Sequence, residues 1–166
     1  VCRNAFAYLR MAFKELTLNN FRCFKSIKIN LSPGINFFYG KNGSGKTSLL
    51  EAIHLCSSGK SFKSSNLQSL IAQGEDSFSL RSYDVDKGYI LSITKEKNKS
   101  ISVLINNTKA TSSRLIREFP STAIHNNTFS FADASPDFRR KILDRALFVS
   151  DKSFLENWFA YYRCLK

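Results

Sequence analysis

The segment Gly40-Lys41-Asn42-Gly43-Ser44-Gly45-Lys46-Thr47 matches the phosphate-binding pattern G-x-x-x-x-G-K-[ST] at all four fixed positions. In proteins this loop joins a strand to a helix, because its backbone N–H groups and the start of the helix converge on a phosphate. The preceding residues Ile35–Tyr39 form a short apolar run, which predicts a buried strand. The residues after the loop, Ser48–Leu55, have helix-forming composition. This order predicts an α/β domain of the P-loop NTPase class.

Each loop position has a predicted role. The glycines allow a tight backbone turn whose N–H groups point at a polyphosphate. We expect Lys46 to reach the β- and γ-phosphates and the Thr47 hydroxyl to bind Mg²⁺. The predicted nucleotide-binding site is therefore Gly40–Thr47, with Thr47 as its metal ligand. A Gly- and Ser-rich turn without a ligand is the competing interpretation.

The chain is strongly basic, with 25 Lys and Arg, 13 Asp and Glu, and a formal net charge of +12. Residues 1–83 hold 11 basic and 4 acidic residues, and residues 84–166 hold 14 and 9, so no basic tail explains the excess. A diffuse positive field favours a polyanion partner, of which nucleic acid is the commonest. A basic protein without such a partner has the same composition, so charge alone leaves both interpretations open.

The composition predicts a folded cytoplasmic protein. A chain of 166 residues that is 43% hydrophobic, with 15 Phe, can bury a core. Its four cysteines are scattered and form no C-x-x-C pair, which indicates ordinary thiols. No apolar run is long enough to span a membrane, and residues 1–10 lack the apolar core of a secretory signal. We expect Met11 to be the natural start and residues 1–10 to be an upstream or non-native extension.

Hydrophobic periodicity and turn residues predict the other elements. Strands are expected at 13–18, 27–31, 77–83, 89–94 and 101–105, with a turn at 19–24 and a hairpin at Asn106-Asn107. The first helix should end near Ser57-Ser58-Gly59, and a short helix is expected at 112–118. Ser135 and Pro136 are predicted to start a helix whose apolar face is Ile142, Leu143, Ala146 and Leu147. Ser153 is predicted to start the last helix.

Hydrolysis of a nucleotide normally needs an acidic residue after an apolar run, to help hold Mg²⁺ and place water. Asp151 is the best candidate, but Ser150 interrupts the run and a capping box begins at Ser153. We therefore favour a helix-start role for Asp151. The sequence holds neither a Leu-Ser-Gly-Gly signature nor a complete Asn-Lys-x-Asp motif. It predicts nucleotide binding and leaves enzymatic turnover open.

Several segments between residue 11 and the end of the chain resemble, in order, the RecF family of bacterial DNA replication and repair proteins. They are Leu18–Phe24, Leu31–Phe37, the phosphate-binding loop with Glu51-Ala52-Ile53, Gly59–Ser64, Pro136–Asp144 and Tyr161–Lys166. The resemblance implies an ABC-type ATPase head related to structural-maintenance-of-chromosomes proteins. Such a head has a mixed sheet with an antiparallel β-subdomain, followed here by the start of a helical arm.

The resemblance also implies cofactors and partners. These are ATP with Mg²⁺, an ATP-dependent homodimer, single-stranded DNA and single–double-strand junctions. The implied role is recombinational repair, replication and SOS induction with RecR and RecO, through the loading of RecA. Arg22 matches a family position close to the nucleotide phosphates, and a surface turn charge is its alternative role.

The chain departs from the family pattern in two respects. The glutamine that links the lobes and senses Mg²⁺ in the family aligns with Thr122, which His125-Asn126-Asn127 soon follows. The family's signature and acidic metal motifs lie beyond the last residue of this sequence. Both departures bear on turnover and on sensing of the γ-phosphate.

Three hypotheses follow. The chain is a nucleotide-binding DNA-repair module, a P-loop enzyme of another class such as a small kinase, or a fragment that does not function alone. We expect a P-loop lobe with β-hairpins over residues 11–134 and the start of a helical lobe over 135–166. Candidates for DNA phosphate contact are Lys60, Lys63, Arg139 and Arg140, although a solvated face or an internal salt bridge suits any one of them.

Overall fold

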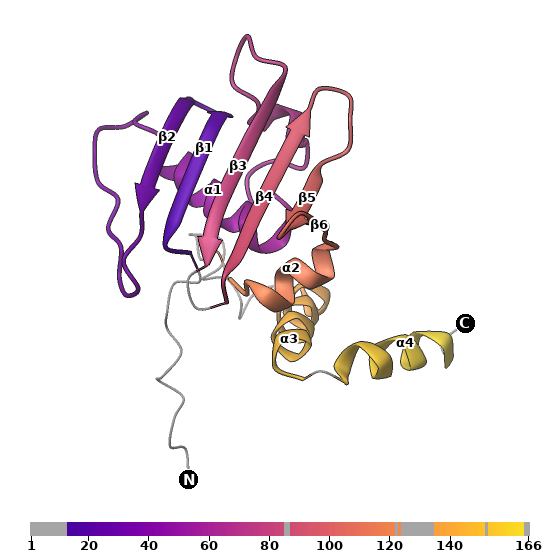
Figure 1. Cartoon of the computed structure of the whole chain (residues 1–166). Coiled ribbons are helices and arrows are strands. Elements are labelled where there is room, and N and C mark those ends of the chain that lie inside the picture. Colours follow the sequence, from indigo (N-terminus) through magenta and orange to yellow (C-terminus); the bar gives the residue numbers. More distant parts are fainter. Residues whose placement is uncertain (1–12, 85–86, 122, 124–134, 152, 165–166) are drawn as a thin grey trace.

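A computed structural model describes residues 13–84, 87–121, 123, 135–151 and 153–164 of the chain. A six-stranded sheet with a helix on one face forms the main body, and three further helices follow at one end of the sheet (Figure 1). The strands are β1 (Glu15–Phe21), β2 (Phe24–Asn30), β3 (Ser77–Asp84), β4 (Tyr89–Glu96), β5 (Ser102–Ile105) and β6 (Thr108–Lys109). The helices are α1 (Lys46–Ser58), the 3₁₀ turn η1 (Leu67–Leu70), α2 (Ser112–Glu118), α3 (Pro136–Ser150) and α4 (Phe154–Cys164).

The sheet has the order β2-β1-β3-β4-β5-β6, and all five pairings among the described strands are antiparallel. Leu18 lies opposite Ile27 on β2 and opposite Leu80 on β3, so apolar positions meet across three strands. The strands predicted at 13–18, 27–31, 77–83, 89–94 and 101–105 and the Asn106-Asn107 hairpin are confirmed. The first turn is tighter than predicted, since β1 runs to Phe21 and β2 begins at Phe24. The described strands thus form the antiparallel part of the expected mixed sheet.

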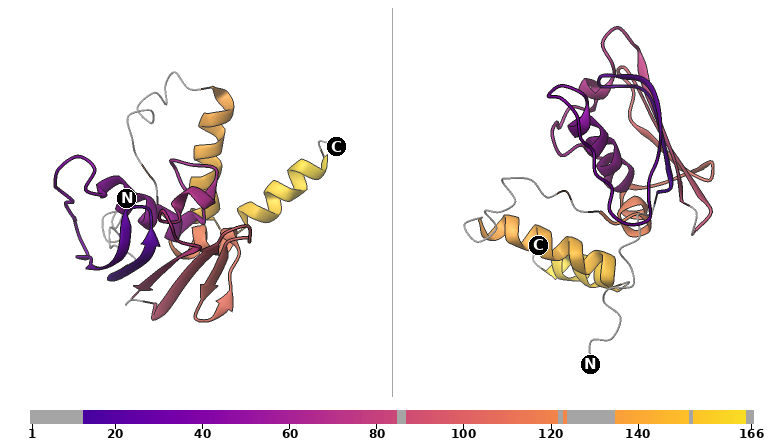
Figure 2. Two further views of the ribbon diagram at one scale, coloured as in Figure 1. Left: turned by 90° about the horizontal axis from the view of Figure 1, so that it is seen from above. Right: turned by 90° about the vertical axis from the view of Figure 1, so that its left-hand side faces the viewer.

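The core lies between the inner face of the sheet and α1. Period-two alternation along the strands places one set of side chains inside, and α1 contributes Leu49, Ala52, Leu55 and Cys56. The sheet residues in the core include Leu16, Leu18, Phe21, Phe78, Leu80, Leu91, Ile93, Val103 and Ile105. Each fully buried Leu or Phe stabilises the fold by about 1.5–3 kcal/mol. Figure 2 shows α1 inside the curve of the sheet, whereas α3 and α4 lie beyond one end.

Helix α1 ends where the sequence predicted. Gly59 adopts a left-handed conformation, with φ of 67°, and its N–H donates to the Leu55 carbonyl at 2.8 Å. Glycine is favoured at this position because a side chain at positive φ meets its own backbone. A Cβ at Gly59 would also lie 3.5 Å from Leu115 of α2, so this end of α1 packs closely on α2.

The prediction that Ile35–Tyr39 forms a buried strand is wrong. These residues have no strand assignment, and Ile35, Phe37 and Tyr39 are 80%, 83% and 94% exposed. A strand that is buried on both faces needs hydrogen-bonded neighbours, and none of the described strands pairs with this segment. Asn36 instead closes a local turn, in which its Oδ1 accepts from the Ser32 N–H at 2.8 Å and its Nδ2 donates to the Ser32 carbonyl at 2.9 Å.

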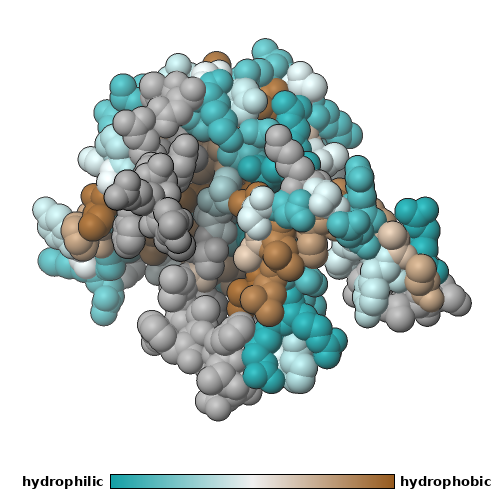
Figure 3. All heavy atoms as spheres, turned by 90° about the horizontal axis from the view of Figure 1, so that it is seen from below, coloured by the Kyte–Doolittle hydropathy of each residue, from teal (hydrophilic) through white to brown (hydrophobic). Residues whose placement is uncertain are grey.

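Helices α2, α3 and α4 are confirmed at their predicted places. The predicted apolar face of α3 is only partly covered, because Leu143 is 57% and Leu147 is 47% exposed. Figure 3 shows apolar side chains near the centre of the molecule as seen from below. Helix α3 is tied to the preceding segment by Arg145, which donates to the Ser121 carbonyl at 3.0 Å, and by Arg117, which lies 4.9 Å from the Phe148 ring centroid.

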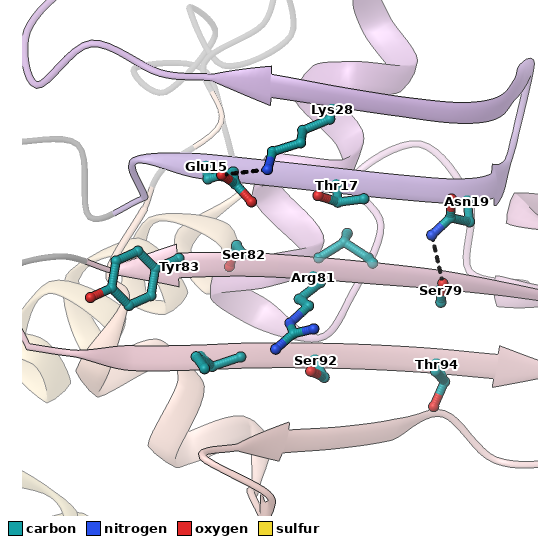
Figure 4. A pocket seen from close by; sticks show the side chains of 12 residues that line it. Glu15, Thr17, Asn19, Lys28, Ser79, Arg81, Ser82, Tyr83, Ser92 and Thr94 are labelled. Atoms are coloured by element: carbon teal, nitrogen blue, oxygen red, sulfur yellow. Dashed lines mark hydrogen bonds and ion pairs between the residues drawn. The ribbon is translucent and has the colours of Figure 1, made fainter.

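The outer face of the sheet carries polar side chains around a shallow depression of about 650 Å³ (Figure 4). Asn19 donates to Ser79 across β1 and β3 at 3.2 Å, and Lys28 pairs with Glu15 across β2 and β1 at 2.9 Å. This face is therefore solvated in the manner of an antiparallel sheet covered on one side. Among the described helices, none is long and apolar enough to cross a bilayer.

Candidate phosphate-binding site

The phosphate-binding loop enters α1 at Gly45, which is the N-cap of the helix. Gly45 has φ of 93°, in the region that favours glycine. A Cβ at this position would lie 2.5 Å from Phe24 Cζ and 2.8 Å from Cys23 Sγ. The β1–β2 turn therefore packs directly on the start of α1, and a side chain at Gly45 would require Phe24 and Cys23 to shift. Glycine is therefore favoured at position 45 by a tertiary contact as well as by its backbone conformation.

Lys46 folds back across the loop. Its Nζ donates to the carbonyls of Gly40 at 2.7 Å and Lys41 at 2.8 Å. The loop itself is closed by the Ser44 N–H, which donates to the Lys41 carbonyl at 3.2 Å. The ammonium thus lies over the loop residues that the sequence predicted to surround a polyphosphate.

The first turn of α1 is suited to an anion. Its N-cap has no side-chain hydrogen bond, and the first turn holds no acidic residue. Helix N-termini present unpaired N–H groups and a partial positive charge, which together favour phosphate. Thr47 lies in this turn with an exposed side chain. One short segment therefore holds the groups that a polyphosphate with Mg²⁺ requires. They are backbone N–H groups, an ammonium and a hydroxyl.

Arg22 lies in the β1–β2 turn, with a positive φ of 55°. Its Nε and Nη2 donate to the two carboxylate oxygens of Glu51 at 3.0 and 2.9 Å, and its Nη1 donates to the Ser69 carbonyl at 2.9 Å. The Arg22 N–H also donates to the Leu70 carbonyl at 2.7 Å. Arg22 is thus held by charge and by backbone contacts beside the loop.

Glu51 was not among the predicted site residues. It is 1% exposed on α1, and the Ser61 hydroxyl donates to the same carboxylate. Burial raises the pKa of Glu51, but hydrogen bonds from Arg22 and Ser61 and the charges of Arg22 and Lys63 outweigh it, so that the pKa lies below its ordinary value. The available sequence signal was an acidic residue among the apolar residues of the helix. If such an acid is buried, it needs a partner.

No second metal ligand is evident in the described residues. They contain no group of three or more His, Cys, Asp or Glu side chains placed to hold a metal ion. Asp151 Oδ1 accepts from the N–H and the hydroxyl of Ser153, both at 2.8 Å, and the Ser153 hydrogen bonds lower the Asp151 pKa. The helix-start role predicted for Asp151 is confirmed. Thr47 stays the predicted Mg²⁺ ligand.

The four basic candidates for DNA contact do not form one cluster in the contacts observed. Arg140 pairs with Asp137 at 3.1 Å on exposed α3, and Arg139 is exposed on the same helix. Lys60 and Lys63 follow α1, beside a depression of about 600 Å³ lined by Gly59–Ser65 and Leu67. Several predictions concern residues outside the described ones. They are the departure at Thr122, the residues His125–Asn127, the start at Met11 and the 1–10 extension.

The AAA-domain family matches residues 15–160, which is most of the chain. The protein belongs to this family. Its fold is that of a P-loop ATPase, as the loop predicted.

Within this class the chain is similar to RecF, which confirms the resemblance. It is 36% identical over 159 residues to the DNA replication and repair protein RecF of Thermoanaerobacter sp. strain X514, covering 93% of this chain and 44% of that protein. A solved structure of the recombination mediator protein RecF with ATP matches with a TM-score of 0.76 at 28% identity, over 97% of this chain and 44% of that one. The chain therefore spans less than half the length of these relatives.

A solved Smc head matches with a TM-score of 0.67 at 21% identity, covering 87% of this chain and 53% of that one. This likeness concerns the fold alone. It agrees with the predicted ATPase-head fold.

Proposed function

We propose that this chain binds ATP with Mg²⁺ through Gly40–Thr47, as the N-terminal portion of a RecF-like ATPase head that acts in DNA replication and repair. The observation that carries the proposal is the joining of the loop to an uncapped α1, with Lys46 folded over the loop carbonyls. The similarity to a RecF structure solved with ATP supports the choice of nucleotide.

In this proposal each group acts through its ordinary chemistry. The Lys46 ammonium exchanges the Gly40 and Lys41 carbonyls for phosphate oxygens, which form stronger, charge-assisted hydrogen bonds. The N–H groups at the start of α1 bind phosphate, and the Thr47 hydroxyl binds Mg²⁺. Arg22 belongs to the proposed site as its neighbour, since the turn that carries it packs on Gly45.

The wider functions of the family are part of the same proposal. They are binding of single-stranded DNA and single–double-strand junctions, cooperation with RecR and RecO, ATP-dependent dimerisation and SOS induction in the cytoplasm. The net charge of +12 supports a polyanion partner, and a solved RecF is described as belonging to the RecFOR pathway. The helices over 136–164 are proposed to begin a helical lobe, because they lie beyond the end of the sheet (Figure 2).

A second candidate is that the chain does not function alone. The exposure of Ile35, Phe37 and Tyr39 supports it, because an apolar segment leading into the loop favours self-association. Aggregation despite the high net charge, measured by size-exclusion chromatography with light scattering, would support this candidate.

The test is calorimetry of ATP·Mg²⁺ binding to the chain and to its Lys46→Ala variant, with circular dichroism of both samples to check folding. We expect measurable binding that the substitution abolishes, because the loop loses its cation. Equal binding by both proteins, or none by a folded wild-type chain, would overturn the proposal. Steep loss of DNA binding between low and moderate salt would support the polyanion partner.

A further inference from the structure

The guanidinium of Arg22 is already engaged on all three of its nitrogens. Two of them hold the Glu51 carboxylate in a bidentate pair, and the third holds the Ser69 carbonyl. A bidentate, charge-assisted pair fixes orientation as well as distance. Glu51 is buried, so separating the pair would leave a charge with little access to water. These contacts use three of the five guanidinium N–H groups, so Arg22 can keep its hold on Glu51 whether or not the two remaining N–H groups, on Nη1 and Nη2, bind another acceptor.

The same pair joins three separate segments of the molecule. Arg22 belongs to the β1–β2 turn, Glu51 to α1, and Ser61, whose hydroxyl donates to Glu51, to the segment after α1. The residues next to Arg22, Cys23 and Phe24, are those whose side chains press on Gly45. The contacts that hold Arg22 therefore also hold Cys23 and Phe24 in place, and these two residues pack on the last glycine of the phosphate-binding loop.

Glu51 and the loop are mechanically linked through α1. Lys46 and Glu51 are five residues apart on this helix, which corresponds to roughly 7.5 Å along its axis. The helix is short and rigid at this length, so that the Arg22–Glu51 pair fixes the turn relative to Lys46 and Thr47. The positive φ of Arg22 makes the turn depend on such contacts, because this conformation is unfavourable without them.

We propose that Glu51 is a positioning residue of the nucleotide site, which through Arg22 holds the β1–β2 turn against Gly45 and so sets the geometry of the phosphate-binding loop. This inference rests on the proposed function. It adds to the family resemblance a role in which Arg22 acts through Glu51 and the β1–β2 turn.

The experiment compares ATP·Mg²⁺ and ADP·Mg²⁺ affinities by calorimetry in Arg22→Ala, Glu51→Gln, the double variant and Asp76→Ala. A misplaced loop holds both nucleotides poorly, so we expect each single change to weaken both by about tenfold. The double variant should be no weaker than the weaker single variant, because both changes break one contact. Asp76→Ala, which removes an exposed pair with Lys97, is the matched control and should bind normally.

An exchange of Glu51 for phosphate gives a different pattern. If Arg22 left Glu51 to bind the γ-phosphate, Arg22→Ala would weaken ATP and spare ADP, and Glu51→Gln would release Arg22 and leave or strengthen ATP binding. Either result would overturn the positioning role, as would normal affinity in both single variants. Glu51→Gln keeps the size of the side chain, and its denaturant midpoint shows whether it remains folded under the binding conditions.

A second readout does not depend on nucleotide. The Arg22 N–H donates to the Leu70 carbonyl at 2.7 Å, so its hydrogen exchange reports how firmly the turn is held. Loosening of the turn should raise the exchange rate of this N–H several-fold in Glu51→Gln, while the N–H of Gly59 at the far end of α1 exchanges as in wild type. An unchanged Arg22 exchange rate would contradict the inference even if the wild-type chain bound no ATP. Failure of the proposed function alone would appear as equal binding by wild type and Lys46→Ala.

Discussion

The two segments that flank the phosphate-binding loop are held in different ways. Downstream, α1 buries Leu49, Ala52 and Leu55 against the sheet and carries Glu51 in its contact with Arg22. Upstream, Ile35, Phe37 and Tyr39 are exposed, Phe38 is half-buried against the core, and a local turn around Asn36 shapes the segment. Both lead into the same eight residues. The difference indicates that the packing of α1, which follows the loop, fixes the geometry of the loop more than the segment before it does.

Thiol chemistry should show the largest contrast between the two flanks. Burial raises the pKa of Cys56 on α1 to about 12. Cys56 is also closed off from solvent, so that its alkylation at pH 8 should be slower than that of an ordinary thiol by on the order of a hundredfold or more. In a background without the other native cysteines, Phe37→Cys should react at the ordinary rate. Comparable rates at the two positions, measured by mass spectrometry, would contradict the contrast.

Truncation of a side chain to alanine should lower the free energy of unfolding far more in α1 than in the upstream segment. Leu55→Ala removes a fully buried side chain from α1 and should lower the free energy of unfolding by about 3 kcal/mol. Phe37→Ala removes a side chain that is 83% exposed and should change it by less than about 0.5 kcal/mol. Urea denaturation of both variants measures the difference. A large loss in Phe37→Ala would mean that the upstream segment is packed in solution.

Glycine substitution tests the contact between loop and turn. Gly45→Ala places a methyl group against Phe24 and Cys23 at a positive φ, and should cost about 1–3 kcal/mol of stability and weaken ATP binding. Gly34→Ala is the matched control, since a Cβ there meets nothing within 4 Å, and it should be close to neutral. Denaturation and calorimetry on the two variants make the comparison. Normal binding by Gly45→Ala would show that the close contact does not shape the loop.

The pH dependence of stability should show the smallest effect. The folded pKa of Glu51 is below its ordinary value, so that its contribution is complete above the unfolded value of about 4.3 and is lost as pH falls from there through the folded pKa. Wild type should therefore lose more stability than Glu51→Gln over this acidic range. Asp76 and Asp151 titrate in both proteins, so that the difference between the two curves isolates Glu51. Parallel curves would mean that the pair adds no pH-dependent stability.

Local chemistry made much of the fold predictable. Period-two alternation located the strands, Asn106-Asn107 marked a hairpin, and Gly59 marked the end of α1. The phosphate-binding loop was readable because its residues are contiguous and each has its own role. Asp151 was correctly assigned to a helix start, since its partner Ser153 lies two residues away.

Contacts between distant segments were beyond such reasoning. Ile35–Tyr39 has the composition of a buried strand, yet burial depends on a neighbour that the described part of the sheet does not supply. Glu51 lies 29 residues from Arg22 and 10 from Ser61, and no periodicity relates them.

The sequence by itself determined where the loop lies, which of its groups suit a phosphate, and where α1 ends, because these depend on neighbours within a few residues. Only the tertiary structure decided that Arg22 is held by Glu51 and that the β1–β2 turn presses on Gly45. The physical reason is that both contacts join segments distant in the sequence. The burial of Glu51 with its partner and the close packing on Gly45 exist only once folding has brought these segments together.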